Sequence, residues 1–319
     1  MGILQNNRGF FLFLIKFAGT YLLLSALYWA YLSQYDAKAF EPDGMTTLVA
    51  EQASGLVNLW GEESHIAKNT KEASWYFFVN GKRLARVVEG CNAVSVMALF
   101  ASFIIAFSTT FKRTSLYIIM GIALLHILNV VRIALLGLGL FYYKEHGPLL
   151  HDIIFPLFIY GVVFVLWIAW VLKLSVVRIK NANALIGILA LLIVLVLVRS
   201  FEASLFYDPL LEFFRKEDKT LPDYDSFKLF VGIAFRYGLN TLFSLGIIWL
   251  AFKDKAILRL ATLLYLVFFV VLTALLFISL NADTPNLMLI FYVRRFLIQP
   301  LLLLLFLPAF FYQKNKKKN

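Results

Sequence analysis

The chain contains little of what a metalloenzyme or a disulfide-stabilised protein requires. It has one cysteine, Cys91, and four histidines in 319 residues. One cysteine cannot form an intrachain disulfide, and the sequence has neither an HExxH nor a CxxC motif. We therefore expect no disulfide framework, no metal site and no cofactor.

Long apolar runs are abundant instead. The chain is 61% hydrophobic, its mean hydropathy is +0.80, and several runs exceed the roughly 20 residues that cross a hydrocarbon core. Because unpaired backbone groups are costly in lipid, such runs must be helices. The pattern predicts an all-α integral membrane protein with about eight transmembrane helices, near residues 9–32, 92–111, 116–140, 153–173, 184–206, 228–252, 258–280 and 288–312.

Positive charge sets the expected orientation in the membrane. The formal net charge is +11. Most of the excess lies near the N-terminus, in the basic segments 111–115, 173–183 and 252–259, and in the terminal lysines. Basic residues concentrate on the cytoplasmic side of short membrane loops. We therefore expect both termini to be cytoplasmic, and we expect no nucleic-acid partner.

This orientation leaves residues 33–90 on the outer side of the membrane. Within this segment, Leu48 to Trp60 have the spacing of an amphipathic helix that lies on the outer leaflet. The stretches "WYFFV" and "KRLARVV" flank Asn80 and Gly81, and Asn-Gly is a strong signal for a β-hairpin. The second strand of this predicted hairpin leads directly to the cysteine.

Three residues from distant stretches are expected to meet near the outer side of the membrane. Cys91 lies at the outer end of the second predicted span, and His151 opens the fourth. Arg132 lies in the third span, about 12 Å below its outer end at 1.5 Å per residue. An arginine within a span is costly and is a functional-site hypothesis by default.

The chemistry of these residues is complementary. A nearby cation or base increases the fraction of a thiol present as thiolate, which is the nucleophilic form. His151 would deliver a proton to a leaving amine, and Arg132 would hydrogen-bond a tetrahedral oxyanion. Asn129, one turn before Arg132, would orient the arginine or bond a neighbouring helix. Other interpretations stay open from these residues alone: the cysteine is a small buried hydrophobe, the arginine snorkels, and the histidine is an interfacial polar residue.

Three stretches carry a resemblance to a known family. "EGCNAVSVM", "HILNVVRIALL" and "LLHDIIFPLFIYGVVF" resemble the signature stretches of the exosortase/archaeosortase family, and most closely its Bacteroidetes branch, exosortase F. The resemblance implies that Cys91 is the nucleophile, Arg132 the transition-state stabiliser and His151 the general acid/base. Many family members follow the cysteine with Ser-Gly, where this chain has Asn92 and Ala93. We expect Asn92 and Asn129 to support the site.

Family members are membrane-embedded cysteine transpeptidases. They cleave a C-terminal sorting signal, which is a short motif followed by a transmembrane helix and a basic tail, from proteins bound for the cell surface. The resemblance implies the same cysteine protease/transpeptidase activity here, in a bacterial inner membrane with the active site facing the periplasm. The implied partners are such substrate proteins, the lipid bilayer, and an acceptor that is an amine, a hydroxyl, a lipid, a glycan or water.

A second module is expected after the basic stretch at 178–183. The region near 184–312 resembles the separate exosortase F system-associated membrane protein, so we divide the chain into 1–180 and 181–319. The arginines of this half would contact a lipid phosphate or a partner, or would form internal ion pairs in a packing scaffold. Charged residues expected in the outer half of the membrane, where arginines need acidic partners, are Arg199, Glu202, Arg236, Arg294 and Arg295.

A function from a different class also stays open. A non-enzymatic transporter or assembly subunit would bind anionic lipid or glycan through these outer arginines. A transporter is expected to show repeat symmetry or broken helices in paired positions. Neither feature is evident in the sequence, so the cysteine enzyme is the preferred hypothesis.

Overall fold

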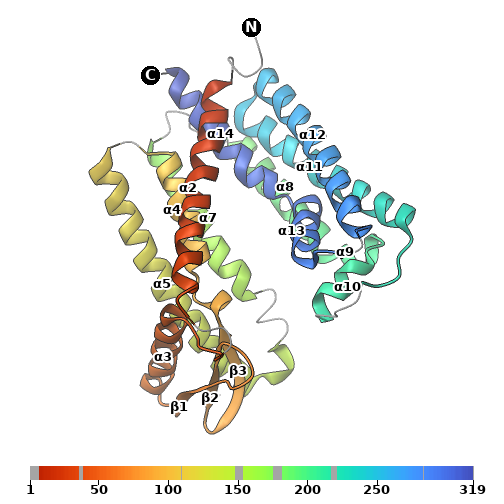
Figure 1. Cartoon of the computed structure of the whole chain (residues 1–319). Helices are drawn as coiled ribbons and strands as arrows, with labels where there is room; N and C mark the ends of the chain where they lie inside the picture. The colour runs from red at the N-terminus through yellow and green to blue at the C-terminus, as the bar shows by residue number, and fades with distance from the viewer. Residues whose placement is uncertain are drawn as a thin grey trace. The chain divides into compact units, whose positions relative to one another are not determined.

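The structure is a computed structural model that describes residues 7–35, 39–108, 110–147, 154–174, 182–216, 221–282 and 284–318. The described chain is mostly helical and includes one small sheet (Figure 1). Its elements are α2 (Arg8–Leu32), α3 (Gly44–Leu59), β1 (Ser64–Lys68), β2 (Ser74–Val79), β3 (Lys82–Val88), η1 (Glu89–Cys91), α4 (Val94–Ala106), α5 (Phe111–Tyr142), η2 (Lys144–His146), α7 (Phe155–Leu174), α8 (Ala182–Ser200), α9 (Glu202–Leu205), α10 (Pro209–Lys216), α11 (Ser226–Phe252), α12 (Lys255–Leu280), α13 (Leu287–Ile298) and α14 (Leu301–Lys318).

Several helices can cross a membrane, as the composition predicts. Among the described residues, five helices are long and apolar enough, or six if the bent pair α13 and α14 forms one span. The five are α2, α5, most of α8, α11 and α12. Two further predicted spans, 92–111 and 153–173, contain the shorter apolar helices Val94–Ala106 and Phe158–Val171. By length and composition, the described helices that pass are therefore fewer than the sequence predicts.

Local backbone features explain where predicted spans shorten or bend. Ala93 has a left-handed φ of 61°, so α4 begins only at Val94. Gln299 is extended, with φ −116° and ψ 149°, as is typical of a residue before proline. Because Pro300 also has no N–H to donate, the predicted span 288–312 is broken, and α13 and α14 are bent by 63°.

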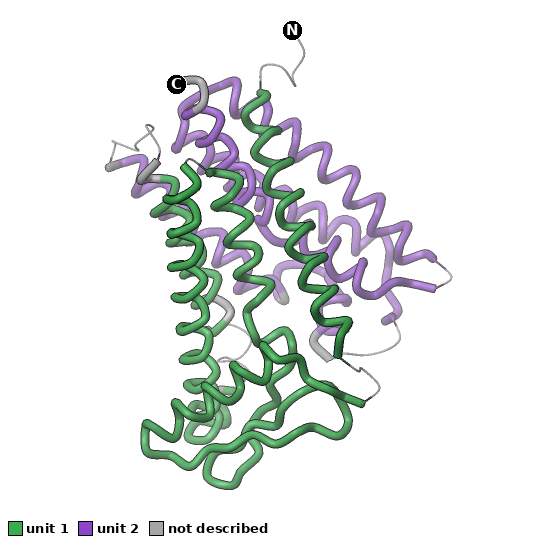
Figure 2. Tube along the Cα trace, turned by 60° about the vertical axis from the view of Figure 1, so that its left-hand side comes forward, with its two compact units in different colours: residues 1–175 green, residues 176–319 purple. Residues whose placement is uncertain are grey.

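The chain divides into two compact units, residues 1–175 and 176–319 (Figure 2). In the first unit, α2 packs along α4 through aromatic rings. The Phe13 ring lies edge-on to Phe103 at 5.7 Å and to Phe107 at 5.1 Å between centroids. Phe103 in turn stacks on Trp167 of α7 at 4.2 Å. This aromatic core holds the C-terminal end of α4 beside α2 and α7.

The segment before α4 forms a three-stranded antiparallel sheet in the order β1-β2-β3. Asn80 and Gly81 join β2 to β3 with positive φ of 49° and 72°, the conformation that a two-residue hairpin turn requires. The sequence interpretation did not include β1, whose residues "SHIAK" are short and partly polar. It pairs with β2 so that His65 lies opposite Phe78, and their rings stack at 4.7 Å.

The sheet and α3 both pack on the C-terminal part of α5. We expected the apolar residues of α3 between Leu48 and Trp60 to lie on the outer leaflet, and Leu48, Leu59 and Trp60 are indeed exposed. A further face of α3, which the sequence interpretation did not single out, is buried against protein. The shared core consists of Val49, Ala50, Ala53 and Val57 of α3, Phe77, Val79 and Val87 of the sheet, and Val130, Ile133 and Ala134 of α5.

The second unit is a helical bundle with its own core. Helix α8 packs along α11, and α12 packs against both α11 and α13. Three of its helices begin at a side chain that accepts hydrogen bonds from the first-turn N–H groups, as N-caps do. These caps are Asp225 for α11, Asp254 for α12 and Asn286 for α13.

Candidate active site

The cysteine lies at a sharp change of backbone direction. Strand β3 ends at Val88, a single 3-10 turn spans Glu89–Cys91, and α4 begins after the left-handed residue Ala93. The Cys91 side chain is partly buried and packs against the core that α3, the sheet and α5 share. The thiol therefore lies just before the N-terminus of a helix, where the dipole favours negative charge.

A buried polar network holds the residue after the cysteine. The Asn92 Nδ2 donates to the Tyr28 hydroxyl at 2.8 Å and to Thr46 Oγ1 at 3.2 Å, and it lies 3.5 Å from Asp43 Oδ1. Its Oδ1 accepts from the Val94 N–H at 2.9 Å, which ties it to the start of α4. Because Asn92, Thr46 and Asp43 are all buried, these bonds set the position of the turn relative to α2 and α3.

This network contains residues that sequence reasoning missed. Tyr28 lies in an apolar run, and nothing local marks it as polar support for a distant turn. Asp43 and Thr46 carry a usable signal, because an aspartate just before a helical stretch is a typical N-cap. Asp43 Oδ1 accepts from the N–H groups of Met45 and Thr46, each at 3.0 Å. The sequence could have shown the cap but not its contact with Asn92.

Asn129 holds the cysteine from the other side. Its Nδ2 donates to the Cys91 carbonyl oxygen at 2.8 Å, and the residue is fully buried. The sequence left two interpretations of this asparagine open: to orient Arg132 or to bond a neighbouring helix. The bond to the Cys91 carbonyl differs from both, because its partner is the turn before α4. Its Oδ1 is buried and makes no hydrogen bond within the described part of the chain.

Arg132 lies one turn further along α5 and faces the same region. Its guanidinium is near enough to Cys91 and Tyr160 to stabilise negative charge on either side chain. Its Nε is buried and makes no hydrogen bond with the described residues. The structure thus brings Cys91 and Arg132 together, and it adds Tyr160 of α7, to which the sequence interpretation gave no role. An arginine with a free buried donor beside a thiol can stabilise a developing anion.

The third predicted site residue, His151, lies outside the described residues. Two other histidines, His65 and His126, contact neighbouring side chains other than Cys91. The ring Nε2 of His126 on α5 lies 2.7 Å from Gln52 Oε1 of α3, and His65 stacks on Phe78 in the sheet. Within the ranges that the structure describes, no group of three His, Cys, Asp or Glu side chains is arranged to hold a metal ion.

The charged residues of the second unit form a compact ionic cluster. Arg199 and Arg236 both donate to Glu202 Oε2. The Arg294 Nε lies 3.1 Å from each carboxylate oxygen of Asp208, and Arg236 Nη1 lies 3.8 Å from Asp208 Oδ2. The acidic partners that the sequence argument required are therefore supplied within the chain.

The cluster accounts for most of the buried charge. Arg236 is 1% exposed and Arg294 4% exposed, so leaving either unpaired would be costly. Arg295 lies apart from these pairs, since its Nε donates to Gln299 Oε1 at 3.1 Å and its guanidinium lies over the Phe291 ring. The chain itself supplies acidic partners for Arg199, Arg236 and Arg294, which favours the scaffold interpretation of this half. The Nε and Nη1 of Arg236 are buried and make no hydrogen bond with the described residues.

Comparison of the chain with protein-family models, with curated proteins and with solved structures finds no match.

Proposed function

We propose that this chain is a membrane-embedded cysteine protease/transpeptidase that cleaves a C-terminal sorting signal from exported proteins. One observation carries the proposal most directly. The single thiol of the chain, Cys91, is held at the start of a helix and interacts with the positive charge of Arg132. The resemblance of three sequence stretches to exosortases supports the same chemistry.

The reaction needs two steps at Cys91. The thiolate attacks the scissile carbonyl carbon, a C–S bond forms, and the oxyanion of the tetrahedral intermediate accepts hydrogen bonds from Arg132. The C–N bond then breaks, and the leaving amine takes a proton, a role that we assign to His151. An acceptor amine, hydroxyl or water next attacks the thioester, gives up a proton, and releases the thiol.

The helix lengths support a thiol near the outer boundary of the membrane. Tyr28 lies 20 residues along α2 from Arg8, which is about 30 Å at 1.5 Å per residue. This equals the thickness of a hydrocarbon core of about 30 Å. The Tyr28 hydroxyl accepts a hydrogen bond from Asn92, so the cysteine turn is at the same level. A substrate helix that crosses the same bilayer would present its scissile bond there.

Strand β3 offers a way to align the substrate. It is an edge strand of the described sheet, and its last residue, Val88, is followed directly by the cysteine turn. An extended polypeptide that pairs with an exposed strand edge gains main-chain hydrogen bonds without a sequence requirement. We propose that the sorting motif adds to β3 and runs toward Cys91.

The second unit would act as an accessory module of the same inner-membrane enzyme. Its ionic cluster joins α8, α9, α11 and α13, and it would stabilise the bundle rather than catalyse. In this proposal the active site faces the periplasm. The partners are substrate proteins with a transmembrane sorting signal, the bilayer and a lipid or glycan acceptor.

The first test is a cleavage assay in cells. The chain is co-expressed with a reporter that ends in a motif, a transmembrane helix and a basic tail, and processing is followed by a gel shift. We expect Cys91→Ala and Cys91→Ser to abolish processing at normal membrane levels, because no other cysteine is available. Processing that continues in either variant at the wild-type rate would exclude the cysteine mechanism.

A further inference from the structure

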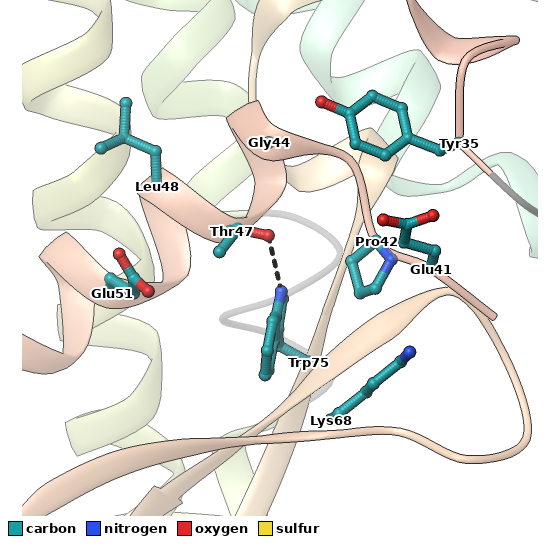
Figure 3. Close-up of a pocket in the computed structure, with 9 residues that line it drawn as sticks. All are labelled: Tyr35, Glu41, Pro42, Gly44, Thr47, Leu48, Glu51, Lys68 and Trp75. Carbon is teal, nitrogen blue, oxygen red and sulfur yellow. Dashed lines mark hydrogen bonds between the residues drawn. The ribbon is translucent and has the colours of Figure 1, made fainter. Parts of the chain in front are cut away.

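A cavity lies in the segment between α2 and α4 of the first unit, beside the start of α3 (Figure 3). It is a shallow depression with a volume of about 530 Å³ and is widely open to the surface. Its wall combines aromatic rings with charged groups. The polar and aromatic residues of this wall are Tyr35, Glu41, Thr47, Glu51, Lys68 and Trp75.

The cavity and the cysteine turn lie against different faces of α3. Gly44, Thr47, Leu48 and Glu51, which line the cavity, follow the i, i+3, i+4, i+7 spacing of a single helix face. Thr46 belongs to the other face, where it accepts a hydrogen bond from Asn92. The body of α3 therefore separates the cavity from Asn92, the neighbour of Cys91.

The walls of the cavity are held in place by hydrogen bonds. The Trp75 Nε1 donates to Thr47 Oγ1 at 2.9 Å, which fixes the indole ring against α3 (Figure 3). The Tyr35 hydroxyl donates to the Tyr31 hydroxyl at 3.0 Å, and Gly44 permits this approach. A Cβ at position 44 would lie 3.0 Å from the Tyr35 hydroxyl oxygen. Such a preformed wall binds without a large ordering cost.

The charges of the wall select a cation. Glu41 and Glu51 supply two carboxylates and Lys68 supplies one ammonium group, so the cavity carries one net negative charge. Indole and phenol faces attract ammonium and guanidinium groups. We propose that this cavity binds a lysine or arginine side chain of the substrate polypeptide. The inference rests on the proposed function, because it takes an extended polypeptide as the substrate.

The test measures binding rather than cleavage. The full chain carrying Cys91→Ala, in detergent or nanodiscs, is titrated against a dye-labelled octapeptide with a central lysine, and binding is followed by fluorescence anisotropy. The same peptide with acetyllysine is the reference ligand. We expect the lysine peptide to bind about fivefold more tightly, the ratio typical of one exposed cation–π contact or ion pair.

A matched pair of variants locates the effect. Glu51→Gln removes a carboxylate from the cavity, and Glu63→Gln removes the same charge from an exposed residue of the same segment that does not line the cavity. We expect Glu51→Gln to abolish the preference for lysine and Glu63→Gln to retain it. Equal affinities for the two peptides, or an equal loss in both variants, would overturn the proposal. Because peptide binding does not need the Cys91 thiol, the binding result can be interpreted even if the cleavage assay fails.

Discussion

At the scale of single residues, two asparagines decide where the thiol lies. Asn92 ties the cysteine turn to α2 and α3, and Asn129 ties the Cys91 carbonyl to α5. Neither side chain has to touch a substrate to matter. Each holds a backbone position in a region where an unsatisfied amide would be costly. Arg132 differs, because it carries a charge and its Nε is a donor without a hydrogen-bond partner among the described residues.

The Arg132→Lys variant tests whether Arg132 takes part in the reaction or only positions the backbone. A lysine keeps the positive charge but lacks the planar fork of donors. We therefore expect cleavage of the reporter to slow by about 100-fold, the effect of losing one donor to an oxyanion. Rates are compared by gel shift at equal membrane levels. The matched control is Arg113→Lys at an exposed position of the same helix, which should cleave normally. Wild-type rates in Arg132→Lys would remove the arginine from the reaction.

At the scale of elements, close packing of the sheet on α5 supports the site. Gly137 allows this approach, since a Cβ there would lie 2.7 Å from a ring carbon of Phe77. Phe77 is 1% exposed, so its ring has little room to move. The β3 strand that leads to Cys91 belongs to the same sheet. The glycine on α5 and the position of the cysteine turn are therefore linked through the sheet.

Gly137→Ala should loosen this contact. Overpacking a filled core costs about 1–3 kcal/mol, so we expect a lower midpoint of thermal unfolding and a slower reporter cleavage. Gly19→Ala on α2 is the control, because no atom lies within 4 Å of its added Cβ. That control should be neutral, or more stable by up to about 1 kcal/mol from helix propensity. A stable Gly137→Ala protein would show that the sheet is not tightly held on α5.

Acid should weaken the same region through Glu62, which follows α3. Hydrogen bonds from the Tyr142 hydroxyl and then from Asn80 lower the pKa of the Glu62 carboxyl below its ordinary value. A lowered folded-state pKa contributes stability that is present above the unfolded pKa and is lost as pH falls through the folded one. We therefore expect the unfolding midpoint to decrease as pH falls below about 4.3. The unfolding midpoint of the Glu62→Gln variant should decrease less over that range. A pH dependence equal to that of the wild type would contradict the role assigned to Glu62.

At the scale of the whole molecule, each compact unit has its own core and its own buried polar cluster. The first unit buries the network around Asn92, which positions the turn that carries Cys91. The second buries the ion pairs of Glu202 and Asp208 with three arginines. In an otherwise apolar chain, both clusters specify which helices meet, because a mismatched pairing would leave polar groups unsatisfied.

Glu202→Gln should therefore destabilise the second unit and spare the first. Removing one partner of a buried ion pair costs about 3–5 kcal/mol, because the other charge stays buried. We expect faster amide hydrogen exchange in α8, α11 and α13, and unchanged exchange in α3 and the sheet. Asp223→Asn, at an exposed position, is the control and should change neither. Faster exchange throughout the chain would show that the two units unfold together.

Local pattern alone determined several properties of this protein. Run length and hydropathy marked a helical membrane protein, because each span must satisfy its own backbone in lipid. Asn80 and Gly81 marked the turn between two apolar stretches, since few residues accept positive φ. Composition reduced the possible nucleophilic thiols to Cys91. Each of these three inferences depends on neighbouring residues or on counting, and none requires knowledge of distant contacts.

Only the tertiary structure decided what surrounds the thiol. Asn92 hydrogen-bonds Tyr28, which is 64 residues away in the sequence, and Thr46, which is 46 residues away. Asn129 hydrogen-bonds the Cys91 carbonyl, which is 38 residues away. Such contacts leave no periodic trace, because each depends on how helices pack and not on local spacing. The same reason explains why the sequence did not show that Ala50, Ala53 and Val57 of α3 pack on the sheet and α5. An apolar helix face looks the same in sequence whichever apolar surface it meets.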